Sequence, residues 1–301
     1  MDNSKTRLLK DNSHAVAFSC VDSVINIDKS YNPSTRYDLD VTNDILIYAS
    51  YPKSPVFYKM LQRLVTFSFK QIYVVYSMPM KPMIDIEKTN ILKHPKIHAI
   101  RVENIGYDFM KYYTGLVKIK ESGQAYSKVW LMNDSFTVMN WNLIAYNYDA
   151  VKHTDITGAF LSKQFKNHLQ SYMLIMNEKV ADFYRSRLSK YPFRPITNKL
   201  EKQTLISDLE IGLFNDLIES MDKIDYRPIF QVRNEAWIGN PTINFAAHCG
   251  LIKEDLMHIC VVWRGRLFKN IDDAIKYDNE RFRPLWQAVK ERQRVIMHVR
   301  K

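Results

Sequence analysis

The sequence is poor in the residues that mark several common classes of protein. Its 301 residues include only eight glycines and three cysteines. The cysteines, Cys20, Cys249 and Cys260, are scattered and form no C-x-x-C pair. This spacing argues against a disulfide framework and a thiolate zinc site, and it favours reduced thiols in a cytosolic compartment. The sequence also lacks G-x-x-x-x-G-K-[ST], G-x-G-x-x-G and G-x-S-x-G, the signatures of P-loop, dinucleotide-binding and serine-hydrolase sites.

Long apolar runs are missing as well. No stretch of about 18 apolar residues occurs, so we expect no membrane-spanning helix. The N-terminal text MDNSKTRLLKDNS has no apolar core of the kind that a secretory signal needs, which again favours a cytoplasmic location. Neither a zinc-finger pattern nor an aromatic RNA-binding motif is present, so nucleic acid is not an expected partner.

What the chain does have is a large apolar fraction and a positive net charge. Hydrophobic residues make up 46% of the sequence, enough for one large core, and the formal charge is +11. A basic surface favours an anionic partner such as a nucleotide diphosphate. The basic residues are concentrated only in 281–301. That tail is interpreted either as a solvated helix that closes the domain, which the charge pattern favours, or as a peripheral contact with a membrane or partner.

Short apolar runs alternate with amphipathic segments over the first 140 residues. We expect buried strands at 44–50, 71–77, 97–102 and 128–132, after a further one at 15–20. Helical spacing of apolar residues occurs at 55–67 and, after Gly106, at 109–116. This alternation predicts an α/β fold with an open, mostly parallel, twisted sheet flanked by helices.

The pattern changes after residue 140. It predicts a strand at 169–176, helices at 178–191 and 208–221 joined by a loop at 192–199, and a short helix within 240–252. We therefore divide the chain into an N-terminal segment packed on the core (1–40), a ligand-binding half (41–140), a C-terminal extension of the same domain that closes the active-site face (141–265), and a basic helical tail (266–301).

Two acidic residues stand where apolar segments give way to polar ones. Asp134 follows the strand at 128–132. It is interpreted as an acid that holds a divalent cation against a diphosphate, or as part of an Asn-Asp-Ser turn bonded to its own backbone. Asp108 opens the helix after Gly106. It is interpreted as an N-cap, which would stabilise the helix by about 1 kcal/mol, or as a contact to the ribose, base or sugar of a ligand.

Further candidates lie in the second half. Glu210, with Asp208 close by, is either a general base of raised pKa or an ordinary acid that complements a helix dipole. His168 and His248 are lone histidines beside apolar residues, and core or surface positions are the simpler interpretation because no second ligand stands at metal-binding spacing.

Six short segments in fixed order resemble one known family. They are R-x-E-N-x-G-Y-D-F at 101–109, a strand ending in N-D-S at 129–135, D-x-x-G at 155–158, H-L-Q-S-Y at 168–172, E-I-G-L at 210–213 and N-P-T at 240–242. Over about residues 40 to 255 the chain resembles the rhamnan synthesis protein F family of glycosyltransferases.

The resemblance implies a GT-A-like fold, a nucleotide-sugar donor (UDP-, dTDP- or GDP-linked), a glycan or polysaccharide acceptor and a divalent cation, Mn²⁺ or Mg²⁺. It implies a donor pocket made of Ser50, Arg101, Asn104, Gly106, Asp108, Asn133, Asp134 and Ser135. His168, Gln170 and Tyr172 would lie on the acceptor side, and Asp134 with His248 would hold the metal. The usual D-x-D motif is reduced to the single acid Asp134, so the alternatives of a cation held with waters or a basic residue in its place stay open.

For an inverting transfer, Glu210 is the expected base, with Asp155 and Asp208 as substitutes. Two competing classes remain. One is a catalytically inactive GT-A-like or basic polyanion-binding protein. The other is a nucleotidyltransferase, which would need at least two carboxylates near the strand tip, where the sequence shows only Asp134.

Overall fold

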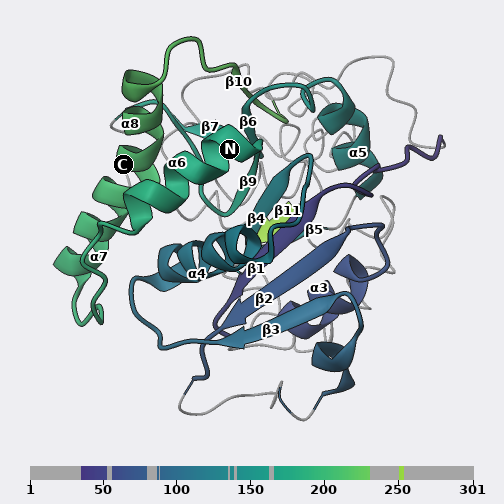
Figure 1. The fold of residues 1–301 in the computed structure, drawn as a ribbon, viewed down its shortest axis with the longest axis horizontal. Coiled ribbons are helices and arrows are strands. Elements are labelled where there is room, and N and C mark those ends of the chain that lie inside the picture. The colour runs from purple at the N-terminus through teal and green to yellow at the C-terminus, as the bar shows by residue number, and fades with distance from the viewer. Residues whose placement is uncertain are drawn as a thin grey trace, which may run out of the picture.

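A computed structural model describes residues 35–52, 56–79, 87, 89–134, 136–138, 141–162, 166–230 and 251–253. Its centre is a seven-stranded sheet in the order β10-β6-β9-β4-β1-β2-β3 (Figure 1). The strands are β1 (Ile45–Ser50), β2 (Gln71–Tyr76), β3 (Ile97–Arg101), β4 (Val129–Asn133), β6 (Ile156–Gly158), β9 (Met173–Met176) and β10 (Tyr226–Pro228). Only β9 runs antiparallel to its neighbours β4 and β6, and every other pair in this sheet is parallel. The predicted fold class, an open, mostly parallel α/β sheet flanked by helices, is confirmed.

Helices cover both faces of the sheet (Figure 1). One face carries α4 (Tyr107–Ser122), α6 (Glu178–Leu188) and α8 (Gly212–Ser220), and the other carries α3 (Val56–Leu64) and α5 (Trp141–Asp149). Side chains of β1 alternate between the two cores: Leu46 and Tyr48 face α3 and α5, whereas Ile47 and Ala49 face α4. Among the described helices, none is both long and apolar enough to cross a bilayer.

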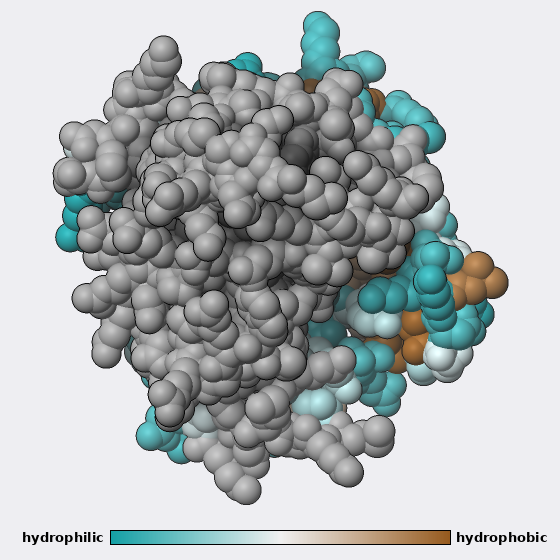
Figure 2. Space-filling model, turned by 180° about the vertical axis from the view of Figure 1, so that it is seen from behind, coloured by the Kyte–Doolittle hydropathy of each residue, from teal (hydrophilic) through white to brown (hydrophobic). Residues whose placement is uncertain are grey.

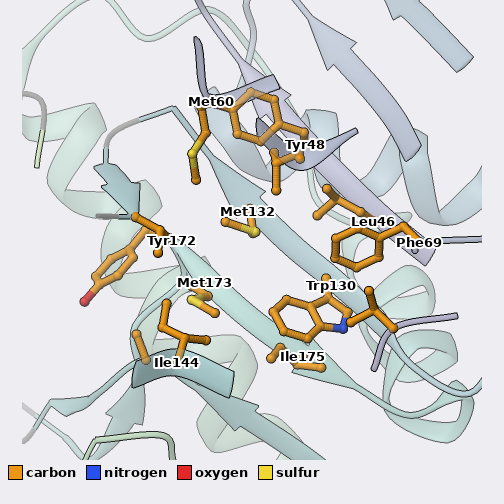
Figure 3. Close-up of a cluster of buried hydrophobic side chains, with 14 of the residues drawn as sticks. Leu46, Tyr48, Met60, Phe69, Trp130, Met132, Ile144, Tyr172, Met173 and Ile175 are labelled. Carbon is orange, nitrogen blue, oxygen red and sulfur yellow. The ribbon is translucent and has the colours of Figure 1, made fainter. Parts of the chain in front are cut away.

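The core between the sheet and α5 is dense and aromatic. Figure 3 shows Trp130 and Met132 of β4 beside Leu46 and Tyr48 of β1 and Ile175 of β9. These five side chains are almost fully buried. Burial of a large apolar side chain stabilises the fold by about 1.5–3 kcal/mol, so this layer fixes the central strands rigidly. Rigid strands in turn fix the residues at their tips.

Some predicted elements differ from the observed ones. The strand expected at 169–176 is interrupted at 170–172. Its first part, β8 (His168–Leu169), pairs with β7 (Leu161–Ser162) instead of the main sheet. Residues 251–253 form β11 beside β5 (Phe136–Val138), whereas a helix was expected within 240–252, most of which lies outside the described residues. The predicted strand at 15–20 and the basic tail at 266–301 also lie outside them.

Two helices begin differently from the prediction. The helix expected at 208 begins nine residues earlier, as α7 (Lys199–Leu205), and reaches α8 through a π-helical turn, η3 (Ile206–Ile211). The remaining short helix, η2 (Asn90–Lys93), precedes β3. In α4 the N-cap is Gly106 in a left-handed conformation, so Asp108 is not the cap. The carboxylate of Asp108 is free for another bond because the glycine turn starts the helix.

Candidate active site

The order of the strands reverses between β1 and β4, and we call the region beyond the carboxyl ends of these two strands the crevice. The chain proceeds from β1 outward to β2 and β3, then returns to the other side of β1 as β4. In open α/β sheets, ligands bind at the carboxyl ends of the strands at such a reversal. Asp134 lies at this point, and its Oδ2 accepts hydrogen bonds from the Ser50 hydroxyl (2.8 Å) and from the Tyr51 backbone N–H (2.7 Å). The tips of β1 and β4 are therefore joined through one carboxylate oxygen.

The tip of β4 is also joined to the first turn of α4. The Nδ2 group of Asn133 donates to Asp108 Oδ2 at 2.7 Å, and the Asn133 side chain is almost fully buried. This bond brings a second carboxylate to the strand tips, which the spacing of 25 residues between Asp108 and Asn133 did not disclose.

Beneath these acids lies a lysine that sequence reasoning missed. Lys111 of α4 is fully buried, and its Nζ donates to Asn104 Oδ1 at 3.2 Å and to the Tyr107 carbonyl at 3.1 Å. Burial lowers the pKa of the Lys111 ammonium, and the negative charges of Asp108 and Asp134 oppose that shift. A signal for this residue did exist, because Lys111 stands three positions after Asp108 and therefore on the same side of the helix.

The acidic side chains at the crevice interact electrostatically. Burial raises the pKa of Asp108 to about 6, against the lowering effect of the Lys111 ammonium, and the charges of Asp134 and Glu210 raise it further. Burial likewise raises the pKa of Asp134, although the hydrogen bonds from Ser50 and Tyr51 favour its ionised form. Such perturbed carboxyls in a crevice are typical of functional sites.

The third acid, Glu210, approaches from the helical wall. Its Oε1 accepts a long bond of 3.4 Å from the Ser171 backbone N–H. The carbonyl of Ser171 accepts from the Tyr112 hydroxyl at 3.0 Å, so segment 170–172 connects Glu210 to α4. Glu210 lies within the π-helical turn η3, and such turns occur frequently at functional sites. The closing π bond runs from the Gly212 backbone N–H to the Ser207 carbonyl, where a Cβ on Gly212 would meet that oxygen at 3.1 Å.

The expected acceptor-side residues lie next to this wall. Tyr172 is buried, and its carbonyl accepts from the Asn133 backbone N–H at 3.2 Å. Gln170 is 8% exposed, and its Oε1 has no hydrogen-bond partner among the described residues. His168 is buried, with Nδ1 at 2.8 Å from the Lys166 carbonyl. The amide oxygen of Gln170 is therefore a buried acceptor without a donor among the described residues.

The structure does not bring every predicted residue to the cluster. Asp155 directly precedes β6, at the end of the sheet opposite to the strand tips, and the strand register places it about 20 Å from Asp134. The side-chain amide of Asn177 and the backbone N–H of Asp225 each donate a hydrogen bond to one of its carboxylate oxygens. Asp208 is exposed, with the Tyr191 hydroxyl at 3.4 Å. Arg101 pairs with Glu87 at 3.1 Å. Ser135 and His248 lie outside the described residues.

The turn that presents Asn104 and Asp108 depends on Gly106. Gly106 has φ +61°, and a Cβ at this position would lie 2.2 Å from Cδ1 of Phe193. Gly123 has nearly the same φ, +62°, but a Cβ there meets nothing within 4 Å. We expect Gly123→Ala to cost about 1 kcal/mol from backbone strain alone, and Gly106→Ala to cost about 2–4 kcal/mol because overpacking adds to it. Urea unfolding of both variants measures the difference, and equal losses would contradict the assigned contact.

The raised pKa of Asp108 predicts a pH-dependent instability. Its folded-state pKa of about 6 exceeds the ordinary aspartate value of 3.8, so the native state binds more protons between these values and stability falls as pH rises through that window. The cost at neutral pH is about 3 kcal/mol. Asp108→Asn should therefore be more stable than the wild type at pH 7 but not at pH 4. Unfolding free energies at both pH values test this, and an Asp108→Asn variant less stable at pH 7 would contradict it.

The known proteins that this chain resembles are only distantly similar to it. No protein-family profile matches it. An uncharacterised protein, y4gN of Sinorhizobium fredii, is 32% identical over 123 residues, which cover 38% of this chain. The match spans 30% of the length of that relative.

Among solved structures, a protein of Desulfovibrio desulfuricans G20 assigned as a nucleotide-diphospho-sugar transferase is 11% identical, with a TM-score of 0.40 over 82% of this chain and 98% of that one. Glucosyl-3-phosphoglycerate synthase of Mycobacterium tuberculosis, solved with Mn²⁺, UDP and phosphoglyceric acid, is 11% identical, with a TM-score of 0.38 over 69% of this chain and 78% of that one. A mannosyltransferase of Pyrobaculum calidifontis, solved with GDP-Man and Mn²⁺, is 9% identical, with a TM-score of 0.37 over 65% of this chain and 68% of that one. At these levels no residue role follows for this chain.

Proposed function

We propose that the protein transfers a sugar from a nucleotide-diphosphate donor to a hydroxyl of a glycan acceptor, with inversion. The observation that carries the proposal is the convergence of Asp108, Asp134 and Glu210 at the reversal point of the sheet. The first two acids lie at the strand tips and the third lies on the facing helical wall. That arrangement separates a donor side from an acceptor side within one crevice.

The donor side needs a cation, because two carboxylates and a diphosphate repel one another. No group of three metal-capable side chains occurs in the described part of the chain. Mg²⁺ and Mn²⁺ nevertheless suit such a site, since Mg²⁺ is commonly held by one or two carboxylates and substrate phosphates. Asp134 would hold the cation through Oδ1, because Oδ2 already accepts two hydrogen bonds. When bound, the cation would neutralise the charge that develops on the departing nucleoside diphosphate.

The acceptor side supplies a base and a positioning group. Among the described residues, Glu210 is held only by the long bond from Ser171, which leaves its carboxylate able to take the proton of an acceptor hydroxyl. Gln170 lies in the same segment as Ser171, and its buried amide oxygen, which has no donor among the described residues, would accept a second hydroxyl of the acceptor once the side chain turns toward it. The distance of Asp155 from the crevice leaves Glu210 as the base that the geometry favours.

Replacement of Glu210 by glutamine should lower turnover by roughly 100-fold or more, the scale expected for loss of a general base. The affinity for the donor should stay nearly constant, because the hydrogen bond of Glu210 is to Ser171 and not to Asp108 or Asp134. Asp208→Asn, two residues away and exposed, is the matched control and should keep full turnover. Steady-state kinetics decide the assignment, and a Glu210→Gln variant with normal turnover removes it.

A thermal-shift panel tests the donor class. A ligand that binds only the folded state raises the melting midpoint by mass action, so UDP-, dTDP- and GDP-sugars should each be tried with and without Mn²⁺. We expect one nucleotide to raise the midpoint, and to do so most strongly with the cation present. No shift from any nucleotide sugar would contradict the proposal.

Nucleotidyl transfer is a second candidate because Asp108 gives the strand tips a second carboxylate. In that reaction a sugar phosphate would attack the α-phosphate of a nucleoside triphosphate and release pyrophosphate. A midpoint raised by nucleoside triphosphates and unchanged by nucleotide sugars would favour it. Release of a nucleoside diphosphate from a nucleotide sugar would favour glycosyl transfer.

A further inference from the structure

A basic rim borders the crevice where the α6–α7 loop meets the start of α4. We define the rim as Tyr107 together with Lys190, Arg194, Lys199 and Lys202. The loop is anchored to the turn before α4, because the Gly106 backbone N–H donates to the Arg194 carbonyl at 3.3 Å. The Lys202 ammonium lies 5.4 Å from the centroid of the Tyr107 ring. The rim therefore directly adjoins Asp108, the residue after Tyr107.

The basic groups of the rim form no ion pair within the described part of the chain. All four basic side chains are exposed, and none forms an ion pair with a described residue. The one acidic residue in 190–202 is Glu201. Its carboxylate accepts hydrogen bonds from the Thr197 backbone N–H at 2.7 Å and from the Thr197 hydroxyl at 2.9 Å. Elsewhere on the same side, Arg185 and Arg187 are paired with Asp182 and Asp216.

Fold stability does not explain these residues. Lys199 is the first residue of α7, where the helix dipole disfavours a cation. Tyr107 has φ +50°, an unusual conformation for a non-glycine residue that costs energy. Tyr107 is 37% exposed, and it and Leu200 are the large hydrophobic residues that the described part of the chain leaves exposed. At the α7 edge, left in Figure 1 and right in Figure 2, mostly hydrophilic side chains surround a small hydrophobic group.

We infer that this rim binds an anionic acceptor glycan, one that carries phosphate or carboxylate groups. The inference rests on the proposed function, in which an acceptor hydroxyl meets Glu210. Lys202 and Glu210 belong to one continuous helix and lie about 12 Å apart along its axis. A chain whose terminal hydroxyl is at Glu210 therefore passes over the rim, where the Tyr107 ring offers a flat face and the lysines offer positive charge.

Direct binding of defined oligosaccharides tests the inference without a donor. The probes are a glycerol-phosphate oligomer, a galacturonate oligomer and neutral dextran, each titrated calorimetrically at low and high salt. We expect an anionic oligomer to bind at least ten-fold more tightly than dextran and to weaken with salt. Whether the phosphate or the carboxylate oligomer binds more tightly identifies the anionic group.

Charge-reversal variants locate the binding surface. The double variant Lys199→Glu/Lys202→Glu should lose at least ten-fold in affinity for the preferred oligomer, and Tyr107→Gly, which removes the ring and relieves the strain, should also lose affinity. Lys179→Glu is the matched control. It is an exposed lysine in a helix first turn, near the far end of α4, where Lys120 pairs with Glu178 at 3.7 Å.

Any of three results would overturn the inference. Dextran could bind as tightly as the anionic oligomers, neither anionic oligomer could bind, or Lys179→Glu could lose as much affinity as the double variant. Nucleotide binding should be unchanged in the double variant. A failure of the proposed function shows instead as absent nucleotide binding in the wild type, so the two failures are distinguishable.

Discussion

Replacing Asp134 with asparagine should reduce glycosyl transfer by about 100- to 1,000-fold, the range for loss of one electrostatic contact to developing charge. The amide keeps the shape of the side chain, and its oxygen can still accept from the Ser50 hydroxyl and the Tyr51 backbone N–H. What is lost is the negative charge that would hold a cation against the diphosphate. Initial rates at saturating donor and cation measure the effect.

The fold should tolerate this change. Burial raises the pKa of Asp134, which means that the structure disfavours its charged form, so a neutral amide should not lower the free energy of unfolding. Asp208→Asn is again the matched control, because it removes an exposed acid that lies outside the cluster. Retention of more than a tenth of the wild-type rate in Asp134→Asn would rule out a role for the carboxylate in charge neutralisation.

Replacing Lys111 with methionine should destabilise the protein by about 3–5 kcal/mol, the usual cost of removing one partner from a buried charged cluster. Methionine fills a similar volume without the ammonium. The change leaves the buried carboxylates near Lys111 without their counter-charge, and it leaves Asn104 Oδ1 and the Tyr107 carbonyl without a donor. Because a domain of this kind is stable by only about 5–15 kcal/mol, the loss is a large share of the total.

The same helix provides a control for this prediction. Lys118 is exposed and pairs with Glu121 at 2.6 Å, so Lys118→Met should cost less than about 1 kcal/mol. A second control is the double variant Lys111→Met/Asp108→Asn. Removal of the uncompensated charge should restore part of the lost stability, because the two residues are coupled. Equal unfolding free energies for the Lys111→Met and Lys118→Met variants would contradict the assigned role of Lys111.

The sequence predicted the sheet and the positions of its tips well, because both depend on local patterns. Apolar runs identified the strands, and the abrupt change after Met132 identified Asp134. The hydrogen bonds that join the tips of β1 and β4 to each other and to α4 depend on tertiary contacts, which no local sequence pattern shows. A helix cap was one of two interpretations of Asp108, because aspartate is a good cap, but the left-handed Gly106 takes that position and Asn133 donates to the carboxylate.

Other features were missed for different physical reasons. A lysine among apolar helix positions ordinarily reaches solvent, so Lys111 carried no sign of burial beyond its spacing from Asp108. The π-helical turn around Glu210 is a change of backbone bonding, which side-chain periodicity does not report. Asp155 was selected through a D-x-x-G resemblance, whereas register places it at the amino end of β6.

The central claim is that a nucleotide diphosphate binds at the tips of β1 and β4. A crystal structure of the protein with its preferred nucleoside diphosphate and Mn²⁺ tests this most directly. We expect the diphosphate beside Asp134, with the cation on Oδ1 and the nucleoside between the tip of β1 and the turn that contains Asn104 and Gly106. A nucleotide bound elsewhere, with Ser50, Asp108 and Asp134 free of ligand, would contradict the account.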